Sequence, residues 1–221
     1  MLNLCSNPTH GHSDLIFGAK KPVSRKVVVL GDGACGKTSL LHVYARGHFP
    51  QVYEPTVFEN HIIETLVGDQ IVELAFWDTA GQEDFDRIRS LSYADTHVIM
   101  LCFSVDQPTS LENTENKWLN EIVEHCPGVK ICLVALKCDL RDDPHIQNQL
   151  AISGQSPVDY EQGLATARRI RASRYLECSA KHNRGVREAF QEVAKVSINC
   201  KSAGFTRHSA QQKDLRGCLI A

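Results

Sequence analysis

The stretch Gly31-Asp32-Gly33-Ala34-Cys35-Gly36-Lys37-Thr38 decides the fold of this chain of 221 residues. Its spacing, G-x-x-x-x-G-K-[ST], is typical of a loop whose consecutive backbone N–H groups surround anionic oxygens, because glycine tolerates conformations closed to other residues. Lys37 would bring a full positive charge to the β- and γ-phosphates, and the Thr38 hydroxyl can ligate Mg²⁺. The loop therefore predicts a site for the phosphate groups of a nucleotide.

The segments on either side of this loop favour the same interpretation. Residues 26–30 are a short β-branched apolar run that stops at the loop, and residues 38–46 have a helical pattern. The helix would add the partial positive charge of its N-terminus. A chance match of the four fixed positions is expected in roughly one such chain in a hundred, and this context makes it much rarer. The loop alone permits an ATPase, a kinase or a GTPase, since it contacts phosphates and ignores the base.

The hydrophobic pattern outside the loop predicts strands that alternate with helices. Gly68-Asp69 is a two-residue turn suited to an antiparallel hairpin, whereas two later runs are continuously apolar, as in central parallel strands. We expect an α/β domain of the P-loop NTPase class, with a six-stranded, mostly parallel sheet, one antiparallel edge strand and helices on both faces. The predicted strands are residues 26–30, 58–67, 70–77, 97–105, 129–136 and 175–178, and the later helices are 108–126, 160–171 and 184–198.

Length and composition indicate one globular domain with two tails. A chain of 24.6 kDa is short for two full domains, and a hydrophobic fraction of 43% is enough for a packed core. Residues 1–24 lack apolar periodicity and predict a flexible N-terminal extension. The domain is expected over residues 25–198, with a polar, helical insertion at about 142–157. Residues 199–221 predict a flexible C-terminal tail.

Charge and cysteine content exclude several classes of protein. A net charge of -2 does not support a nucleic-acid partner, which normally requires a basic surface. Nine cysteines without a CxxC pair fit a reducing compartment. The sequence has no signal peptide and no run of 18 apolar residues that could span a bilayer. The pair His10 and His12 lies in a polar terminal stretch, so we assign no metal site to it.

The stretch Trp77-Asp78-Thr79-Ala80-Gly81-Gln82-Glu83 indicates the reaction. It ends a predicted strand, where Asp78 can reach the Mg²⁺ shell through water, the Gly81 N–H can face the γ-phosphate, and Gln82 can orient a water molecule. With these residues the sequence resembles the Ras-superfamily small GTPases and their G domain. The run Tyr53-Glu54-Pro55-Thr56-Val57-Phe58-Glu59-Asn60 narrows the resemblance to the Rho family. It covers about residues 25–198, including the polar insertion.

The resemblance also indicates how a guanine base is bound. Asp139 would accept hydrogen bonds from guanine N1 and N2, for which adenine has no matching donors. Lys137 would flank the ring, and the Ala180 N–H would meet guanine O6. Phe49 matches a position whose ring packs on guanine, although a buried core phenylalanine is the alternative. Leu136 departs from the family, which has Asn or Thr there, so one hydrogen bond between the base loop and the phosphate loop is missing.

The residues expected to bind GTP or GDP and Mg²⁺ can be collected from these motifs. Thr56 would belong to a first switch and residues 81–95 to a second. The expected metal ligands are Thr38, Thr56 and, through water, Asp78, and the expected catalytic residues are Gln82, Lys37, Thr56 and Gly81. The nucleotide-binding set is Gly31, Asp32, Gly33, Ala34, Cys35, Gly36, Lys37, Thr38, Ser39, Phe49, Tyr53, Thr56, Asp78, Gly81, Lys137, Cys138, Asp139, Ser179, Ala180 and Lys181.

Two kinds of protein fit this set, a cycling GTPase and a non-hydrolysing module locked in the GTP form. A side chain at Gly33 would crowd the transition state, and loss of Gln82 would leave the water unoriented. The sequence keeps both residues, so we favour the enzyme. Since no arginine obviously provides a finger in cis, hydrolysis should be slow until a GTPase-activating protein supplies one.

The C-terminus predicts a lipid anchor. Cys218-Leu219-Ile220-Ala221 matches a prenylation signal at Cys218. One lipid chain binds a membrane only marginally, and the tail is weakly basic, so Cys5 and Cys200 are candidates for palmitoylation. Cys5 is favoured because it lies in a free tail, whereas Cys200 abuts the last helix.

The N-terminal extension and Leu136 together resemble fungal Rho proteins of the third subclass. That resemblance implies a switch in cell polarity, actin organisation and exocytosis at the cytoplasmic face of the plasma membrane, with a cytosolic pool. The implied partners are a guanine nucleotide exchange factor, a GTPase-activating protein, a Rho GDP-dissociation inhibitor and effectors that bind the GTP form. We expect a monomer with no nucleic-acid partner.

Overall fold

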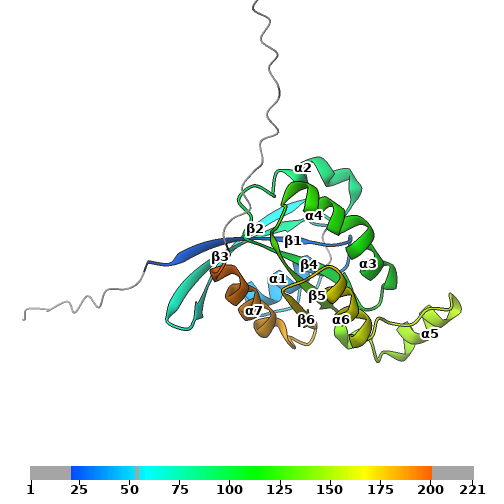
Figure 1. Ribbon diagram of the computed structural model, residues 1–221. Coiled ribbons are helices and arrows are strands. Elements are labelled where there is room, and N and C mark those ends of the chain that lie inside the picture. The colour runs from blue at the N-terminus through cyan, green and yellow to red at the C-terminus, as the bar shows by residue number, and fades with distance from the viewer. Residues whose placement is uncertain (1–20, 53–54, 201–221) are drawn as a thin grey trace, which may run out of the picture.

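The structure is a computed structural model that describes residues 21–52 and 55–200 (Figure 1). A six-stranded sheet runs through it in the order β2-β3-β1-β4-β5-β6. The hairpin β2–β3 is antiparallel, and every other neighbouring pair is parallel. The predicted fold class is therefore confirmed. The strands are β1 (Val23–Leu30), β2 (Phe58–Val67), β3 (Gln70–Thr79), β4 (Val98–Ser104), β5 (Lys130–Leu136) and β6 (Arg174–Glu177).

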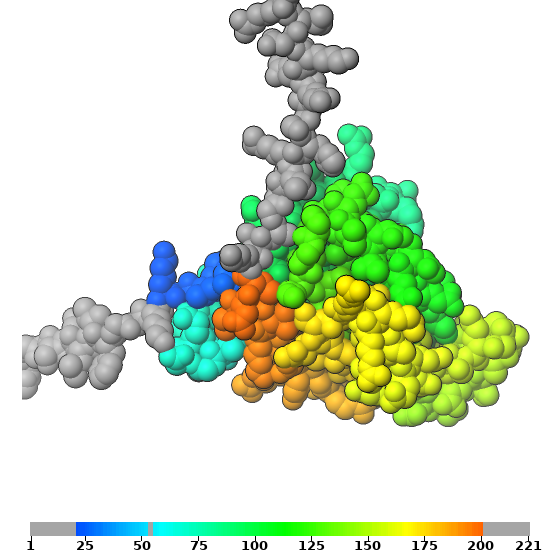
Figure 2. Space-filling view, viewed as in Figure 1, coloured from blue at the N-terminus to red at the C-terminus, as the bar shows by residue number. Residues whose placement is uncertain are grey.

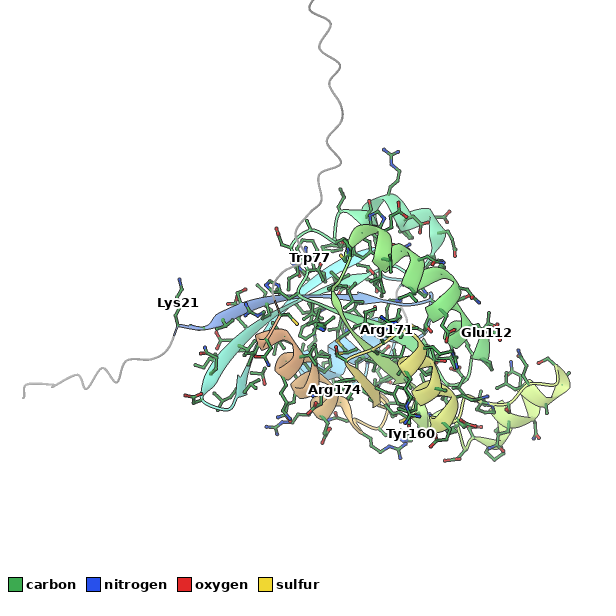
Figure 3. The ribbon with its side chains drawn as sticks, in the orientation of Figure 1. Lys21, Trp77, Glu112, Tyr160, Arg171 and Arg174 are labelled. Atoms are coloured by element: carbon green, nitrogen blue, oxygen red, sulfur yellow. The ribbon has the colours of Figure 1, made fainter. Side chains whose placement is uncertain are left out.

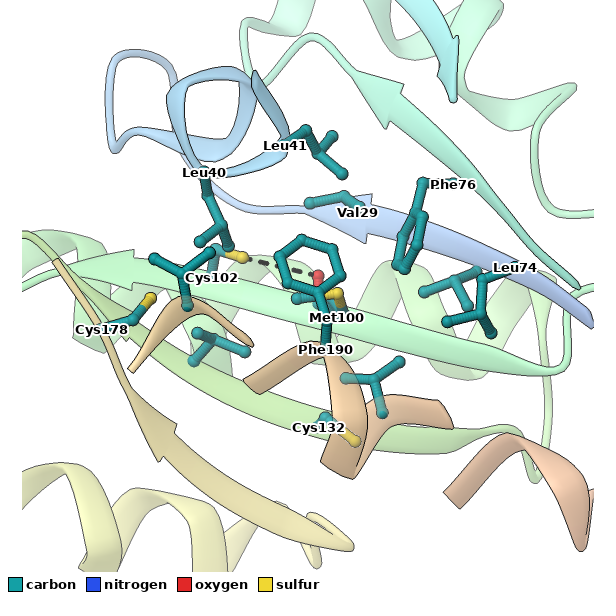
Figure 4. Close-up of a cluster of buried hydrophobic side chains, with 14 of the residues drawn as sticks. Val29, Leu40, Leu41, Leu74, Phe76, Met100, Cys102, Cys132, Cys178 and Phe190 are labelled. Atoms are coloured by element: carbon teal, nitrogen blue, oxygen red, sulfur yellow. Dashed lines mark hydrogen bonds between the residues drawn. The ribbon is translucent and has the colours of Figure 1, made fainter. Parts of the chain in front are cut away.

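Helices cover both faces of this sheet, as the two hydrophobic clusters show. The first cluster joins the sheet to α1 (Lys37–Arg46) and α7 (Val186–Ile198). At its centre Phe190 meets Phe76 edge-on (Figure 4). Phe190 also stacks on Tyr44, with ring centroids 3.7 Å apart. The second cluster joins the other face to α3 (Pro108–Asn113), α4 (Leu119–His125) and α6 (Tyr160–Arg169). Because β4 and β5 lie between the two clusters, their side chains are almost all buried, as their apolar runs predict.

The observed boundaries differ from the predicted ones where tertiary pairing extends an element. β1 begins at Val23, since Val23, Ser24 and Arg25 pair with β3 although they lie outside the apolar run. β3 continues to Thr79, whose hydroxyl donates to the Val29 carbonyl over 2.8 Å. The long helix predicted at 108–126 is continuous but contains a π-helical turn, η2 (Thr114–Trp118). None of these features has a hydrophobic periodicity that could reveal it.

The remaining short helices lie around the rim of the sheet. They are η1 (Glu83–Phe85), α2 (Asp86–Ser90), η3 (Cys138–Leu140) and α5 (Pro144–Ile152). α5 falls within the predicted insertion and forms a lobe at the edge of the molecule (Figures 1 and 2). At its N-terminus the Asp143 carboxylate accepts from the N–H groups of His145 and Ile146. Within the described residues, no helix is long and apolar enough to cross a membrane.

The sheet brings the sequence motifs to a single edge. The phosphate loop follows β1, the stretch ending in Gln82 follows β3, Lys137 follows β5, and Ala180 follows β6. In a parallel sheet these carboxyl ends point the same way, and ligands bind in the crevice beyond them. A bidentate ion pair between Arg141 and Glu177, with N–O distances of 2.7 and 2.9 Å, links the loop after β5 to β6. The fold therefore assembles motifs that are far apart in the sequence.

Trp77 lies on β3, in the strand that leads to Asp78 (Figure 3). The Nζ atom of Lys26 lies 3.5 Å from its ring centroid, and Phe58 of β2 meets it edge-on at 5.2 Å. Burial lowers the pKa of Lys26, although nearby Asp95 opposes this shift. These contacts hold three strands together just before the segment that enters the site.

Candidate functional site

The phosphate loop wraps around the ammonium group of Lys37. Gly31 and Gly36 have φ angles of 137° and 110°, which L side chains rarely adopt, and a Cβ on Gly31 would lie 2.1 Å from the Cys102 carbonyl oxygen. Lys37 begins α1, and its Nζ donates to the carbonyls of Gly31 and Asp32 over 2.8 and 2.9 Å. The lysine is only 6% exposed. Its charge is thus held across the loop, close to the N-terminus of the helix.

The three expected metal ligands meet beside this lysine. The Thr38 hydroxyl donates to Asp78 Oδ2 over 2.6 Å and lies 2.5 Å from the Thr56 hydroxyl. Asp78 is fully buried, and its other carboxylate oxygen has no hydrogen-bond partner among the described residues. Burial raises the pKa of Asp78 to about 6. A buried carboxylate oxygen and two hydroxyls form an all-oxygen donor set, which suits a hard cation such as Mg²⁺.

The segment after β3 packs directly on the phosphate loop. A Cβ on Gly81 would lie 2.3 Å from the Gly31 carbonyl oxygen and 2.4 Å from the Gly33 nitrogen, so only glycine fits there. A Cβ on Gly33 would lie 3.5 Å from the Gln82 side chain. The two residues expected to distinguish a cycling GTPase from a locked one are therefore neighbours in space. They are 49 positions apart in the sequence, from 33 to 82.

Two cavities that share lining residues lie along this edge. The larger has a volume of about 680 Å³ and the smaller about 240 Å³. Gly36, Ser39, Phe49 and Lys137 line both cavities, so they form one cleft. Of the expected residues, the larger is also lined by Gly33, Ala34, Lys37, Thr38, Thr56, Gly81 and Gln82, and the smaller by Asp139, Ala180 and Lys181.

The smaller cavity has the chemistry expected of a base pocket. Asp139 lines it, and one of its carboxylate oxygens is buried without a hydrogen-bond partner among the described residues. Phe49 lies at the junction of the two cavities and is 37% exposed, so it is not a buried core phenylalanine. Lys137 adopts a left-handed conformation with φ 55°, and its Nζ lies 3.4 Å from Asp106 Oδ2. The pocket thus combines an apolar wall with one unpaired acceptor.

Several expected residues do not line either cavity with their side chains. Cys35, Cys138 and Ser179 are buried, so only their backbone can face a ligand. Burial raises the pKa of the Cys35 thiol, despite the nearby charge of Lys37. Gly31, Asp32 and Asp78 line neither cavity but bind residues that do, the first two through carbonyls that accept from Lys37 and the third through its bond to Thr38. Tyr53, Cys5 and Cys218 lie outside the described residues.

Some residues of the cleft were not expected from the sequence. His42, Arg46, His48 and Glu59 line the larger cavity, and Leu140 lines the smaller one beside Leu136, the position that departs from the family. The five unexpected residues were assigned to no phosphate or base motif, so only their place on or next to α1, β2 and η3 brings them here. Arg46 ends α1, whereas Lys37 begins it, and ten helical residues span about 15 Å. Arg46 therefore lies too far along the helix to reach the phosphate end as an arginine finger.

Comparisons with known proteins agree with this geometry. The model of a family described as the Ras family matches residues 26–199. The chain is 61% identical over 204 residues to the GTP-binding protein Rho3 of Schizophyllum commune, covering 92% of this chain and 95% of that protein. It is 56% identical over 206 residues to rho3 of Schizosaccharomyces pombe, with coverage of 93% and 98%. RHO3 of Saccharomyces cerevisiae is 55% identical over 201 residues, with coverage of 81% and 87%.

Family and fold thus lead to one conclusion. The matched region includes all six strands except the first three residues of β1, and every motif at the carboxyl edge of the sheet. The chain belongs to the Rho proteins of the Ras family, and it is a small GTPase that binds guanine nucleotides and hydrolyses GTP.

Proposed function

We propose that the larger cavity binds the phosphates and ribose of GTP and that the smaller one binds guanine. The observation that carries this proposal is the buried, unpaired carboxylate oxygen of Asp139 in a pocket continuous with the phosphate loop. A buried acceptor without a partner is costly, and the N1 and N2 groups of guanine would satisfy it. Phe49 and Lys137 would cover the ring, and the Ala180 N–H would bind O6. Adenine would leave Asp139 unpaired, which disfavours it strongly.

The hydroxyls of Thr38 and Thr56 and the carboxylate of Asp78 are proposed to hold Mg²⁺, with Asp78 acting through water. These residues fit the ion because Asp78 Oδ1 is buried and unpaired among the described residues. When bound, Mg²⁺ would neutralise charge on the β- and γ-phosphate oxygens. Thr38 would exchange its hydrogen bond to Asp78 for the ion, and Thr56 would close over the site from the first switch.

Hydrolysis requires the protein to position groups and stabilise charge, since phosphoryl transfer to water needs little covalent chemistry. Lys37 would stabilise the negative charge, and the Gly81 N–H would bind the γ-phosphate. Gln82 would orient the attacking water in the space that Gly33 leaves open, because a side chain on Gly33 would meet Gln82. The relatives and these two residues give no support to the alternative of a GTP-locked module.

We propose that partner proteins distinguish the GTP form from the GDP form by the conformation of the two switches. Thr56 and Gly81 would hold the switches while the γ-phosphate is present and release them after hydrolysis. Regulation by an exchange factor and a GTPase-activating protein, and recognition by effectors, follow from membership of the Rho proteins in general. A Rho GDP-dissociation inhibitor would bind the lipid-carrying form in the cytosol.

We also propose that the chain acts at the cytoplasmic face of the plasma membrane, in cell polarity, actin organisation and exocytosis. Prenylation of Cys218 would provide one anchor and palmitoylation of Cys5 a second. Cys200 is a poorer candidate than Cys5, because its thiol is half-buried and donates to the Val196 carbonyl over 3.0 Å. Both Cys5 and Cys218 lie outside the described residues.

Asp139→Asn should change the base preference. We expect at least about a hundredfold weaker binding of GDP, because two hydrogen bonds to a charged group are lost. Binding of xanthosine diphosphate should strengthen, because xanthine has a carbonyl where guanine has its 2-amino group. Asp142→Asn, an exposed aspartate outside the cavities, is the matched control. Adenine nucleotide extracted from the purified wild type, identified by chromatography, would contradict the proposed function.

Leu136→Thr should slow the release of GDP by about fivefold, the effect of one added hydrogen bond. Leu136 lies below the phosphate loop, with its side chain 3.7 Å from the position of a Cβ on Gly36. Leu136→Val is the matched control, because valine has nearly the shape of threonine but no hydroxyl. It separates the effect of side-chain volume on GDP release from the effect of a hydrogen bond. Release rates measured with fluorescent GDP that are equal for the Thr and Val variants would show that no such bond forms.

Gln82→Leu should hydrolyse GTP at least about a hundredfold more slowly than wild type when a Rho GTPase-activating protein is present. Affinity for GTP should change little, since Gln82 acts on the water. Gln149→Leu, an exposed glutamine on α5, serves as the control. Phosphate release at the wild-type rate would remove the role assigned to Gln82.

Cys218→Ser should abolish fractionation of the full chain with membranes in the native cell, because the prenyl group is lost. Cys5→Ser should reduce it, and Cys200→Ser should leave it unchanged. Undiminished membrane association of Cys5→Ser would exclude a second anchor at that residue.

A further inference from the structure

The side chain of Asp32 points away from the nucleotide cleft, toward the helix behind the phosphate loop. Asn113 Nδ2 donates to its Oδ2 over 2.7 Å, and Trp118 Nε1 donates to its Oδ1 over 2.7 Å. Asp32 lines neither cavity. Its backbone carbonyl, however, accepts from Lys37 Nζ over 2.9 Å. A helix outside the site therefore holds a residue of the loop that carries the catalytic lysine.

The π-helical turn η2 explains how two side chains reach the same carboxylate. Asn113 and Trp118 are five residues apart, and in a regular α-helix such residues point about 140° apart around the axis. In η2 the Leu119 N–H donates to the Thr114 carbonyl, an i to i+5 bond. One extra residue in the turn brings Asn113 and Trp118 toward the same face. Isolated π turns inside α-helices often occur at functional sites.

The next turns of the same helix hold the segment that contains Gln82. Glu121 accepts from Arg89 at Nε and Nη2, over 2.7 and 2.9 Å, and from the Tyr93 hydroxyl over 2.6 Å. Although burial opposes it, these hydrogen bonds lower the pKa of Glu121, so the carboxylate stays ionised. Arg89 is only 1% exposed, and its Nη1 donates to the carbonyls of Ala80 and Gln82 over 3.0 and 3.4 Å. Through Arg89, the helix is thus linked to the residues on both sides of Gly81, Ala80 and Gln82.

Trp118 connects the two sets of contacts. The guanidinium carbon of Arg89 and the ammonium of Lys117 each lie 4.8 Å from the centroid of its ring, a distance at which cations attract an aromatic face. Lys117 also pairs with Glu83, which follows Gln82. Trp118 therefore binds Asp32 through the N–H at the edge of its ring and packs its ring face against two cations, Arg89 and Lys117, that contact the segment after β3. Both loops touch each other at Gly81 and Gly33.

We propose that Trp118 is a positioning residue that couples the phosphate loop to the second switch. Its indole N–H fixes Asp32, and its ring supports Arg89, so a rearrangement of residues 81–95 on nucleotide exchange changes the surroundings of Trp118 and the hold on Asp32. The inference rests on the nucleotide site proposed above. It goes beyond that site in assigning an influence on nucleotide release to Trp118, which lies behind the phosphate loop and lines neither cavity.

A double-mutant cycle on GDP release tests the first half of this proposal. Trp118→Phe keeps an aromatic ring but removes the N–H donor, and we expect release to accelerate by about tenfold, as for loss of a hydrogen bond to a charged group. In the Asp32→Ala background the same substitution should have almost no effect, because the carboxylate is absent. If Trp118→Phe accelerated GDP release equally in both backgrounds, the substitution would act by loosening the protein in general, and the proposal would be overturned. GDP release from Trp118→Phe within twofold of the wild-type rate would overturn it as well.

Fluorescence tests the second half without altering Trp118. The chain has two tryptophans, so Trp77→Phe leaves Trp118 as the single reporter. We expect its emission to differ between the GDP form and the form loaded with the slowly hydrolysed analogue GTPγS. Lys117→Ala in this background should reduce the difference, whereas Lys195→Ala, an exposed lysine on α7 that also pairs with a glutamate, should not reduce it.

Identical emission in the two nucleotide forms would overturn the coupling, even if Trp118→Phe fails to fold. Failure of the wild-type chain to bind GDP would instead contradict the proposed function. The two failures are therefore distinguishable in one set of measurements.

Discussion

The structure depends above all on one buried positive charge, the ammonium group of Lys37. It is enclosed by the phosphate loop, and its hydrogen bonds go to neutral groups, chiefly the Gly31 and Asp32 carbonyls. A buried charge without full compensation is unfavourable, so this arrangement favours an anionic ligand. The first turn of α1 adds free N–H groups beside it. Phosphate binding thus follows from the same backbone shape that the glycines make possible.

Two carboxylates of the site also keep a buried polar atom without a partner in the described part of the chain. Asp78 and Asp139 each keep one buried oxygen unpaired among the described residues, one near the phosphate loop and one in the base pocket. A cation and a base with two N–H groups would satisfy them. The site is therefore built from buried groups whose partners come with the ligand, and this makes the ligand part of the stability of the domain.

The helix from Pro108 to His125 supports this site from outside. It contributes no residue to either cavity, but it contacts both loops that meet at Gly33 and Gly81. The contacts are charge-assisted hydrogen bonds in a partly buried region, which are stronger than exposed ion pairs. The positions of Gly33 and Gln82 relative to each other therefore depend on residues far from the chemistry.

The amino-acid sequence alone predicted the class of fold, the phosphate loop, and the residues expected to act in hydrolysis and in base recognition. These features are local, because strand periodicity, glycine spacing and the motif after each strand are readable in short windows of sequence. Phe49, Lys137, Asp139 and Ala180 could be assigned to one base site because the family motifs mark each of them.

Only the tertiary structure decided how these motifs meet. Strand pairing extended β1 to Val23, and the folding of α1 brought His42 and Arg46 into the cleft. The two hydrogen bonds that hold Asp32 have no signature in hydrophobic periodicity, because they join residues 81 and 86 positions apart. The π turn is local, but its extra residue per turn does not show in the apolar pattern either. Local preferences set the elements, whereas long-range contacts set the geometry of the site.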